Sequence, residues 1–454
     1  MTNSQNLREM ALEILVESEK TGAYPNVLLK QMLDKFEFME KQERAFLTRL
    51  TDGTVERRIT LDYYLDQVSK TPVHKMKPVI RSLMRMAAYQ IFFMDSVPDH
   101  AACSEAVKLA RKKGFATLKG FVNGVLRNLI RQKENLSLPE EAKDPVRFLS
   151  VSDSVPEWLV EKIIEDRGMD AAKAMFSSMY EDVGTTTIRV NNSRISTEEC
   201  AKCLEEENVH VKKAPYVENA LEISGYDSLN GLESFQKGYY QVQDVSSMLV
   251  GLCADPKKGD YVIDVCAAPG GKSIHAADLL EGTGHVEARD LTPYKVSLIK
   301  ENIVRCGFSN LTAKCADACV CDESARESAD IVIADLPCSG LGVLKKKSDI
   351  KYRMSLQQIE ELVKLQRSIL KNAATYVKPG GTLIYSTCTV TKEENEQQVE
   401  WILKNLPLEP VALEGCICEE LLGENRESCF LQLLPGREKT DGFFLAKFRK
   451  KEKL

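Results

Sequence analysis

The chain has 454 residues, 43% of them hydrophobic and 28% charged, and its formal net charge at pH 7 is −6. This length predicts two to four domains with ample material for a large core, and the acidic balance argues against indiscriminate binding of polyanions. The apolar run at 86–94 is far too short for a membrane span, and the polar residues 1–6 do not resemble a secretory signal. With 14 cysteines, we therefore expect a cytoplasmic protein whose thiols are reduced.

Residues 1–140 are predicted to be all-helical, because apolar side chains recur there with the period of an amphipathic helix. One such stripe comprises Leu7, Met10, Ala11, Ile14 and Leu15, and another comprises Val122, Val125, Leu126, Leu129 and Ile130. Eight basic residues and one acidic residue lie between Glu105 and Lys133, with Ser104 as the expected N-cap and Gly114 as the expected stop of a basic helix. Charge runs are usually solvated faces, but this cluster and two smaller ones, at 345–353 and 447–453, make nucleic acid a candidate partner.

A polar stretch with three prolines, residues 134–156, is predicted to be a linker. A small α+β module over 150–235 is indicated by short strands at 187–190 and 209–211. A capping box, Ser196-Thr197-Glu198-Glu199, opens a helix between them. The predicted domains are therefore a helical domain over 1–140, this α+β module over 150–235 and an α/β domain over 236–454.

From about residue 236 the pattern alternates between strand and helix. Near-continuous apolar strands are predicted at 261–265, 285–288, 311–313, 331–334 and 382–385. Helical segments such as 293–305 and 355–377 separate them, so we predict a doubly wound parallel sheet of the Rossmann-like type. Ligands of such sheets collect beyond the carboxyl ends of the strands, where the remaining motifs fall.

The first of these strands runs into a loop of small residues that opens a helix: Cys266-Ala267-Ala268-Pro269-Gly270-Gly271-Lys272. Small residues let the backbone approach a ligand closely, and a helix N-terminus offers free N–H groups to a carboxylate or phosphate. The loop has neither the P-loop spacing nor the G-x-G-x-x-G fingerprint, which disfavours nucleoside triphosphates and NAD.

Two aspartates follow the next two strands. Asp290 closes the second strand, where it can accept hydrogen bonds from both ribose hydroxyls, and Asp317 ends the third, within reach of an adenine amino group. Either aspartate alone is more simply a cap or turn residue. As a set after successive strands they favour a small adenosine ligand with a carboxylate and no phosphate, so S-adenosyl-L-methionine is the predicted cofactor.

Two cysteines stand where predicted strands break into loops. Cys338 lies in Asp335-Leu336-Pro337-Cys338-Ser339-Gly340, and Cys388 lies in Tyr385-Ser386-Thr387-Cys388-Thr389. Cysteine is most often a buried core residue. Two thiols at strand ends beside a carboxylate favour covalent chemistry instead.

We predict no metal site. Cys200 and Cys203 form a C-x-x-C pair and Cys416 and Cys418 lie two residues apart, but no second pair or spaced histidine pair completes a ligand set. The chain has only five histidines.

Together these motifs resemble the motif series of the RNA 5-methylcytosine methyltransferases. The resemblance rests on the loop at 266–272, on the aspartates and cysteines above, and on flanking segments at 241–247 and 441–444, and it covers about 155–454. It implies a class I methyltransferase fold that methylates C5 of a cytosine, with S-adenosyl-L-methionine held by 266–272 and the three aspartates Asp290, Asp317 and Asp335.

The same resemblance implies a role for each group of the reaction. Cys388 maps to the nucleophile that adds to C6 of the base, and Cys338 maps to the cysteine that assists release. Asp335 would hydrogen-bond the cytosine edge. An amino-methyltransferase would instead carry an (Asn/Asp)-Pro-Pro-(Tyr/Phe) loop and would need no thiol.

The helical part, with Phe121-Val122-Asn123-Gly124-Val125-Leu126-Arg127, resembles the RNA-binding antitermination factor NusB. The pairing of the two resemblances implies 16S ribosomal RNA as the substrate, bound by a monomer with RNA contacts in both front modules. Because the catalytic half does not encode which RNA is bound, a transfer RNA 5-methylcytosine methyltransferase is the alternative. A purely RNA-binding role would leave the cofactor loop and both cysteines without a purpose.

Several lysines keep two interpretations. Lys272 and Lys295 could contact the cofactor or the base, or could simply be solvated surface charges. Lys345 and Lys346 stand where related enzymes commonly carry arginines, so bidentate contacts to phosphate are lost there, while Asp349 and Lys351 keep the family pattern.

Overall fold

The computed structural model describes residues 6–36, 39–181, 184–423 and 426–452. By its internal contacts the chain divides into two compact units. The helical unit comprises Met1–Glu165 with Lys346–Arg353, and the sheet unit comprises Asp166–Lys345 with Met354–Leu454. Most of the polar start and the end of the third basic group, residues 1–5 and Lys453, lie outside the described residues. The three predicted domain ranges stay predictions.

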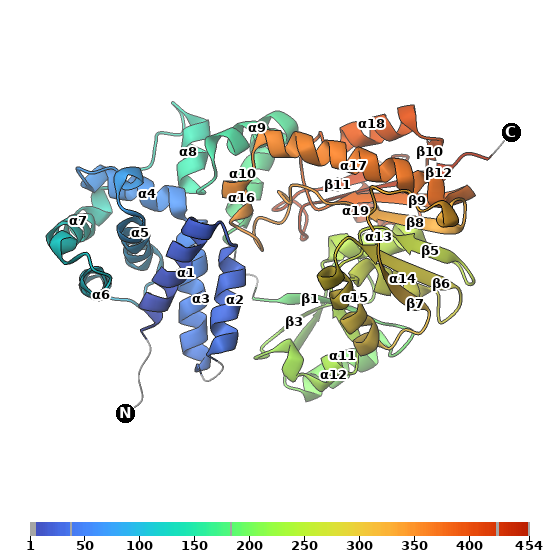
Figure 1. Ribbon diagram of the computed structural model, residues 1–454, viewed down its shortest axis with the longest axis horizontal. Helices are drawn as coiled ribbons and strands as arrows, with labels where there is room; N and C mark the ends of the chain where they lie inside the picture. Colours follow the sequence, from blue (N-terminus) through green and yellow to red (C-terminus); the bar gives the residue numbers. More distant parts are fainter. Residues whose placement is uncertain (1–5, 37–38, 182–183, 424–425, 453–454) are drawn as a thin grey trace. The chain divides into compact units, whose positions relative to one another are not determined.

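The helical unit confirms the expectation for residues 1–140. Its helices within the described ranges are α1 (Leu7–Thr21), α2 (Pro25–Lys35), α3 (Lys41–Glu56), α4 (Arg58–Val68), α5 (Pro78–Phe93), α6 (Asp99–Lys112), α7 (Lys119–Gln132), α8 (Pro145–Ser152), the start of α9 (Glu157–Arg167), α16 (Ile350–Arg353), and the 3₁₀ turns η1 (Val73–Lys75), η2 (Ala116–Leu118) and η3 (Lys133–Asn135). Helix α5 is central, because it packs against α1, α3, α4, α6 and α7 (Figure 1). Pro78, at its first position, fits there since that N–H would lack a partner in any case.

Two expectations for this part of the chain were wrong. Ser104 does not begin the basic helix but lies inside α6, which starts at Asp99 after Pro98. The predicted linker at 134–156 contains α8, whose first turn is capped by the Asp144 carboxylate and opened by Pro145. An Asp-Pro pair can begin a helix as well as interrupt one. Here the packing of α8 against α4 favours a helix that begins at this pair. Gly114 does end α6, with a φ of 85° that favours glycine.

The segment Lys346–Arg353 packs within the helical unit, although it comes from the loop after β8 in the sequence. The Tyr352 hydroxyl donates to the carbonyl of Glu56 at 2.9 Å, and its ring lies under the Arg58 guanidinium at 3.8 Å. Arg353 donates to the carbonyl of Ala23 at 2.7 Å. Lys351 is only 1% exposed. Lys351 is therefore taken up by packing, whereas Lys346 and Lys347 of the same basic group are exposed.

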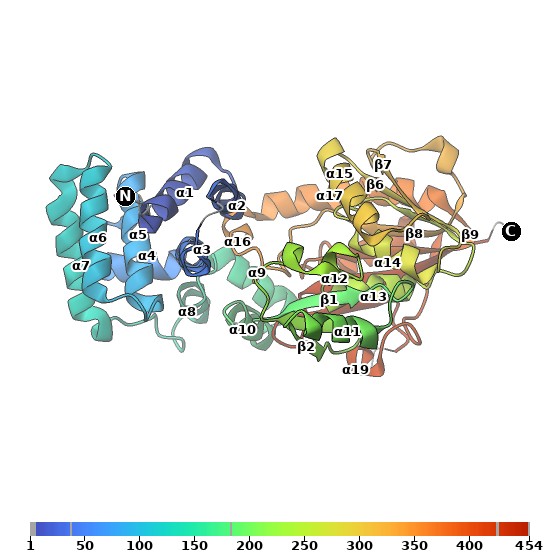
Figure 2. The same ribbon diagram turned by 90° about the horizontal axis from the view of Figure 1, so that it is seen from below.

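The sheet unit begins with a small α+β module, as predicted. Its elements are α10 (Met169–Ser178), β1 (Thr186–Val190), α11 (Thr197–Glu206), β2 (His210–Lys213), β3 (Ala220–Ser224), η4 (Leu229–Gly231), α12 (Glu233–Gln236) and β4 (Tyr240–Val242). The strands form an antiparallel sheet in the order β2-β3-β1-β4. Figure 2 shows β1 and β2 of this sheet, with α11 beside β2. The predicted capping box is present, since Ser196 and Glu199 bond each other's backbone N–H at the start of α11.

A larger sheet follows. Its strands are β5 (Tyr261–Asp264), β6 (His285–Asp290), β7 (Leu311–Cys315), β8 (Ala329–Asp335), β9 (Val377–Thr387), β10 (Leu408–Pro410), β11 (Phe430–Leu433) and β12 (Phe443–Lys450). In the described part of the chain their order is β10-β12-β9-β8-β5-β6-β7, with β11 paired to β12. The five predicted strands are parallel, but β12 is antiparallel to β9, so the sheet is mixed rather than wholly parallel.

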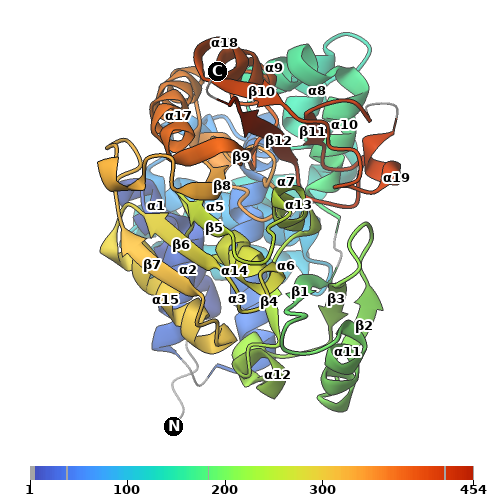
Figure 3. The same ribbon diagram turned by 90° about the vertical axis from the view of Figure 1, so that its right-hand side faces the viewer.

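Helices cover both faces of this sheet (Figure 3). They are α13 (Val245–Ala254), α14 (Gly271–Leu279) and α15 (Pro293–Cys306) on one face, and α17 (Leu356–Tyr376) and α18 (Glu396–Asn405) on the other; α19 (Glu419–Leu422) and the turn η5 (Glu323–Ala325) lie in loops. In β8, Ile331 and Ile333 join the core of the first group, whereas Val332 and Ala334 join that of the second. Alternate residues of a strand point to opposite faces, which explains the unbroken apolar run at 331–334 in β8.

No helix within the described ranges is long and apolar enough to cross a membrane. The described side chains also include no group of three or more His, Cys, Asp or Glu that could hold a metal ion.

Candidate active site

The loop after β5 carries the first residues of the candidate cofactor site. The N–H of Ala267 donates to the carbonyl of Arg289 at 2.8 Å, and the N–H of Ala268 donates to Asp290 at 3.0 Å, so the loop is held over the end of β6. Gly270 has a φ of 104° and precedes α14 without a side-chain cap. The first N–H groups of α14 are therefore not occupied by a cap, which suits the carboxylate of an amino-acid cofactor.

Asp290 ends β6, as predicted, and is nearly buried. Its second oxygen accepts the N–H of Leu291 at 2.8 Å and lies 3.2 Å from the Nζ atom of Lys295. Lys295 is thus an ion-pair partner of Asp290 on a half-exposed side chain. This contact accounts for Lys295 without a direct role in the reaction.

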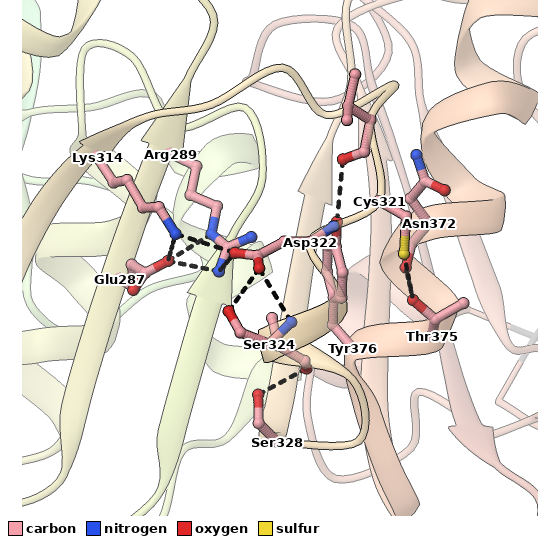
Figure 4. A network of polar contacts seen from close by, with 12 residues as sticks. Glu287, Arg289, Lys314, Cys321, Asp322, Ser324, Ser328, Asn372, Thr375 and Tyr376 are labelled. Carbon is pink, nitrogen blue, oxygen red and sulfur yellow. Dashed lines mark hydrogen bonds and ion pairs between the residues drawn. The ribbon is translucent and has the colours of Figure 1, made fainter.

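Asp317 lies two residues beyond β7, which ends at Cys315, and its exposed carboxylate accepts the N–H of Cys319 at 2.8 Å. The loop that carries it is fixed by a polar network on Asp322 (Figure 4). Asp322 pairs with Lys314 at 2.9 Å, and its N–H donates to the Tyr376 hydroxyl at 2.9 Å. Hydrogen bonds from Ser324 and then from Lys314 lower the pKa of Asp322 to about 2.

Asp335, the last residue of β8, is held on both oxygens. One accepts the Ser386 hydroxyl at 2.7 Å, and the other lies 2.7 Å from the Nζ atom of Lys272, at the start of α14. Burial alone would lower the pKa of Lys272, but the Asp335 carboxylate outweighs it and raises that pKa. Lys272 is therefore a charged, largely buried partner of Asp335 and not a solvated surface lysine.

The two predicted cysteines meet at the ends of β8 and β9. The Sγ atoms of Cys338 and Cys388 are 3.4 Å apart, and both side chains are partly exposed. The hydrogen bond from the Cys338 thiol to the Cys388 sulfur, together with burial, raises the pKa of Cys338 well above its ordinary value. When the pair loses one proton, the direction of this shift leaves the remaining proton on Cys338.

A buried carboxylate that the motifs did not predict holds the two cysteine loops together. Glu394 accepts the N–H of Ser339 at 2.9 Å and the Ser339 hydroxyl at 2.5 Å. It also accepts the Thr391 hydroxyl at 2.8 Å and the Gln366 amide at 3.0 Å. Because Ser339 follows Cys338 and Thr391 follows Cys388 closely in sequence, Glu394 sets the distance between the thiols. The sequence signal was an acidic residue six positions after Cys388, which looks like ordinary surface charge.

We expect Glu394→Ala to lower the free energy of unfolding by about 2–4 kcal/mol, because it strands buried donors and leaves a cavity. Glu394→Gln should cost less, since the two hydroxyls can reverse and accept from the amide. Urea-induced unfolding measures both. Exposed Glu400 on α18 is the matched control, and Glu400→Ala should stay within about 0.5 kcal/mol. Equal losses of unfolding free energy at Glu394 and Glu400 would show that Glu394 does not hold the two cysteine loops together.

The larger sheet has an uncapped helix after its first strand and an acidic residue after its second. This is the architecture of a methyltransferase domain, and comparison with known proteins supports the same class. Three family models match in succession: the NusB family over residues 5–131, the ferredoxin-like domain of RsmF/B-like methyltransferases over 155–228, and 16S rRNA methyltransferase RsmB/F over 252–449.

The chain belongs to the family of ribosomal RNA small subunit methyltransferase B. A relative from Bacillus subtilis (strain 168), called probable ribosomal RNA small subunit methyltransferase B, is 38% identical over 449 residues, which cover 98% of this chain and 99% of the relative. The ribosomal RNA small subunit methyltransferase B of Salmonella arizonae is 30% identical, with 99% and 100% covered. The predicted kinship with RNA methyltransferases and with NusB is thereby confirmed.

Solved structures support the fold. The crystal structure of PH0851 is similar with a TM-score of 0.81 and 26% identity, covering 98% of this chain and 99% of that one. NSun6 from Pyrococcus horikoshii, solved with SFG, has a TM-score of 0.57 and 24% identity, and covers 66% of this chain and 99% of its own. The second likeness concerns the fold alone.

Proposed function

We propose that this protein methylates C5 of a cytosine in 16S ribosomal RNA, with S-adenosyl-L-methionine as the methyl donor and a transient bond between Cys388 and the base. The observation that carries the proposal is the 3.4 Å separation of two thiols beside Asp335, at the carboxyl ends of adjacent strands. A nitrogen or oxygen methyltransferase has no use for such a pair, whereas C5 of cytosine is too electron-poor to attack a methyl group unaided.

The residues at the strand ends fit the cofactor. The uncapped start of α14, within 266–272, would take its carboxylate, Asp290 its ribose and Asp317 its adenine, with Asp335 close to the methyl group. When bound, S-adenosyl-L-methionine supplies an electrophilic methyl group. The network on Asp322 holds the Asp317 loop in place.

Different residues of the chain serve different steps of the proposed reaction. The Cys388 thiolate adds to C6 of the cytosine, which makes C5 nucleophilic. Asp335, fixed by Lys272 and Ser386, accepts a hydrogen bond from the exocyclic amine and so orients the ring. After methylation, a base removes the C5 proton and the Cys388–C6 bond breaks. Cys338 is the nearest sulfur to that bond and assists this release.

Its pKa makes Cys338 suited to act late. In the free enzyme the first cause of the raised pKa is the hydrogen bond to the Cys388 sulfur. Once Cys388 is bonded to C6, that sulfur no longer carries charge, and this cause disappears. Cys338 therefore becomes easier to deprotonate when a base is needed.

The substrate must present its target base outside a stack, since an enzyme that does chemistry on a base has to take it out of the stack to reach the target atom. Methyl transfer from labelled S-adenosyl-L-methionine to 16S ribosomal RNA, with the site mapped by bisulfite sequencing, tests the proposal. A single protected cytosine in 16S ribosomal RNA is the expected result. If protected cytosines occur only in transfer RNA, the alternative substrate is favoured. Methyl label on a nitrogen atom of the base would contradict methylation at C5.

The basic cluster between Glu105 and Lys133 is only partly available to RNA. Its ion pairs join Lys108 to Glu105, Lys112 to Glu9, Lys113 to Glu9 and Glu13, and Lys133 to Asp99. Exposed ion pairs of this kind contribute little stability. Arg111, Lys119 and Arg127 on α6 and α7 are exposed, and the described part of the chain offers their side chains no hydrogen-bond or ion-pair partner. These three cations are the proposed RNA contacts.

Replacing all three by glutamine should weaken RNA binding and lower the slope of log Kd against log salt concentration by about 2–3. Each lost phosphate contact lowers that slope by about 0.7–0.9. Filter binding at several salt concentrations measures the slope. The matched control removes equal charge from exposed lysines on α2, α17 and α18, as Lys30, Lys364 and Lys404→Gln. A slope unchanged in the first variant would show that this surface is not an RNA contact.

A further inference from the structure

The proposed nucleophile, Cys388, lies between two residues that are anchored by one buried side chain. The Oδ1 atom of Asn395 accepts a hydrogen bond from the Thr387 hydroxyl at 2.6 Å, and its Nδ2 atom donates to the carbonyl of Thr389 at 3.0 Å. Thr387 and Thr389 come directly before and after Cys388 in the sequence. Asn395 and both threonines are fully buried. The Asn395 amide therefore brackets Cys388 along the chain.

Asn395 is itself held by a second group of polar side chains. Its Nδ2 atom also donates to the Oε1 atom of Gln432 in β11 at 2.7 Å, and the same oxygen accepts a hydrogen bond from Arg167 at 2.9 Å. Arg167, at the end of α9, donates to the carbonyl of Val390 at 2.7 Å and to the Glu396 carboxylate at 2.9 Å. Because both Nδ2 hydrogens of Asn395 have an acceptor, its amide has a single orientation.

Helix capping does not explain this side chain. Asn395 stands at the N-cap position of α18, where an asparagine usually accepts an N–H of the first helical turn. Its side chain makes no such cap and is turned to the residues around Cys388 instead. The neighbouring Glu394 acts elsewhere, because it accepts from Ser339 and Thr391 rather than from the residues next to Cys388. The contacts of Asn395 thus point to a role at the proposed nucleophile.

We propose that Asn395 is a positioning residue for the methyl transfer: its amide fixes the backbone on both sides of Cys388 and so sets the direction in which the thiolate approaches C6 of the cytosine. Attack by sulfur needs reacting atoms about 3–3.5 Å apart and aligned, and a displacement of about 1 Å can cost about 100-fold in rate. Asn395 acts through the backbone and not on the base. This inference rests on the proposed function, because it takes Cys388 as the nucleophile.

Single-turnover methyl transfer, with the full-length enzyme in excess over 16S ribosomal RNA and with saturating S-adenosyl-L-methionine, tests this role. Asn395→Ala should lower the rate constant about 10- to 100-fold, while the Kd values for RNA and cofactor change less than about twofold. A purely structural role gives a different result, because lost stability reduces the fraction of folded enzyme but leaves the rate constant of the folded molecules unchanged. A rate constant within about twofold of the native value would overturn the proposal.

A double-mutant cycle tests whether the Thr387 hydroxyl acts through Asn395. Thr387→Val keeps the shape of the side chain and should lower the same rate constant about fivefold in the native background. In the Asn395→Ala background it should cost less than about twofold, since the partner of the hydroxyl is already gone. Equal losses in both backgrounds would contradict the bracket.

A second variant covers the case in which Asn395→Ala does not fold. Asn395→Asp keeps the size of the side chain and its hydrogen bond from Thr387, but it replaces the donor to Thr389 by an oxygen. Its rate constant should fall about tenfold, which corresponds to one lost hydrogen bond of the stronger kind. A rate constant equal to the native value would count against the proposal in the same way.

Gln397→Ala is the matched control, because Gln397 is exposed on α18 two residues after Asn395. Its rate constant should stay within about twofold of the native value. Failure of the proposed function gives a different pattern: the native protein transfers no methyl group to 16S ribosomal RNA, or Cys388→Ala remains active. If the native protein is active and Cys388→Ala is not, while the Asn395 variants keep the native rate constant, only the positioning role is refuted.

Discussion

Cys388→Ala should abolish methyl transfer, with a fall in kcat of about 10⁴-fold or more, while S-adenosyl-L-methionine still binds. The reason is that C5 becomes nucleophilic only after a sulfur has added to C6, and no other group can make that bond. Cys338 is 3.4 Å away but holds its proton, since its pKa is raised well above the ordinary value. A neighbouring thiol is therefore a poor substitute for the lost nucleophile.

Labelled methyl transfer gives the rate, and isothermal calorimetry with S-adenosyl-L-methionine gives the affinity. Cofactor affinity should change less than threefold, because the proposed cofactor contacts lie at the ends of β5, β6, β7 and β8 rather than on the loop after β9. Cys203→Ala, on α11 of the small module, is the matched control and should retain full activity. Full turnover by Cys388→Ala would disprove the assignment of the nucleophile.

The features that could be predicted from sequence are those written into short stretches of it. A buried parallel strand must be apolar on both faces, so β5, β8 and β9 were recognisable as runs, and whatever follows such a strand must lie at one edge of the sheet. That rule predicts that Cys338, Cys388 and Asp335 lie together. It also placed Asp290 and the loop at 266–272 correctly.

The features that could not be predicted depend on contacts between distant segments. Strand β12 carries apolar residues like its parallel neighbours, and its direction is set only by pairing with β9. Glu394 looks like surface charge until Ser339 and Gln366 are known to donate to it. Lys351 looks like a cation for RNA, yet burial lowers its pKa to about 7, although the nearby Glu56 carboxylate acts to raise it.

The same distinction applies to Lys272 and Lys295, for which sequence left two interpretations. Both lie at the start of a helix after a strand, and both proved to pair with an aspartate, Asp335 and Asp290 respectively. Only their burial separates them. Lys272 is 14% exposed and its ammonium is confined to the site, whereas Lys295 is 51% exposed and screened by water.

Cys338→Ala should trap the enzyme on its RNA. Addition through Cys388 and methylation at C5 need no group from Cys338, so both steps still occur. Release requires loss of the C5 proton as the sulfur departs, and alanine offers nothing that can assist. A protein–RNA adduct that survives denaturation should therefore accumulate, at close to one RNA per enzyme, when S-adenosyl-L-methionine is supplied.

A denaturing gel with labelled RNA shows the adduct as a slowly migrating band. The band should vanish in the double variant Cys338→Ala/Cys388→Ala, because the trapped bond is to Cys388, and it should not form with Cys203→Ala. If Cys338→Ala instead turns over freely without an adduct, another base completes the reaction. Asp335 would then be the nearest candidate, because its carboxylate lies on the strand end that leads into Cys338 and is already fixed by Lys272 and Ser386.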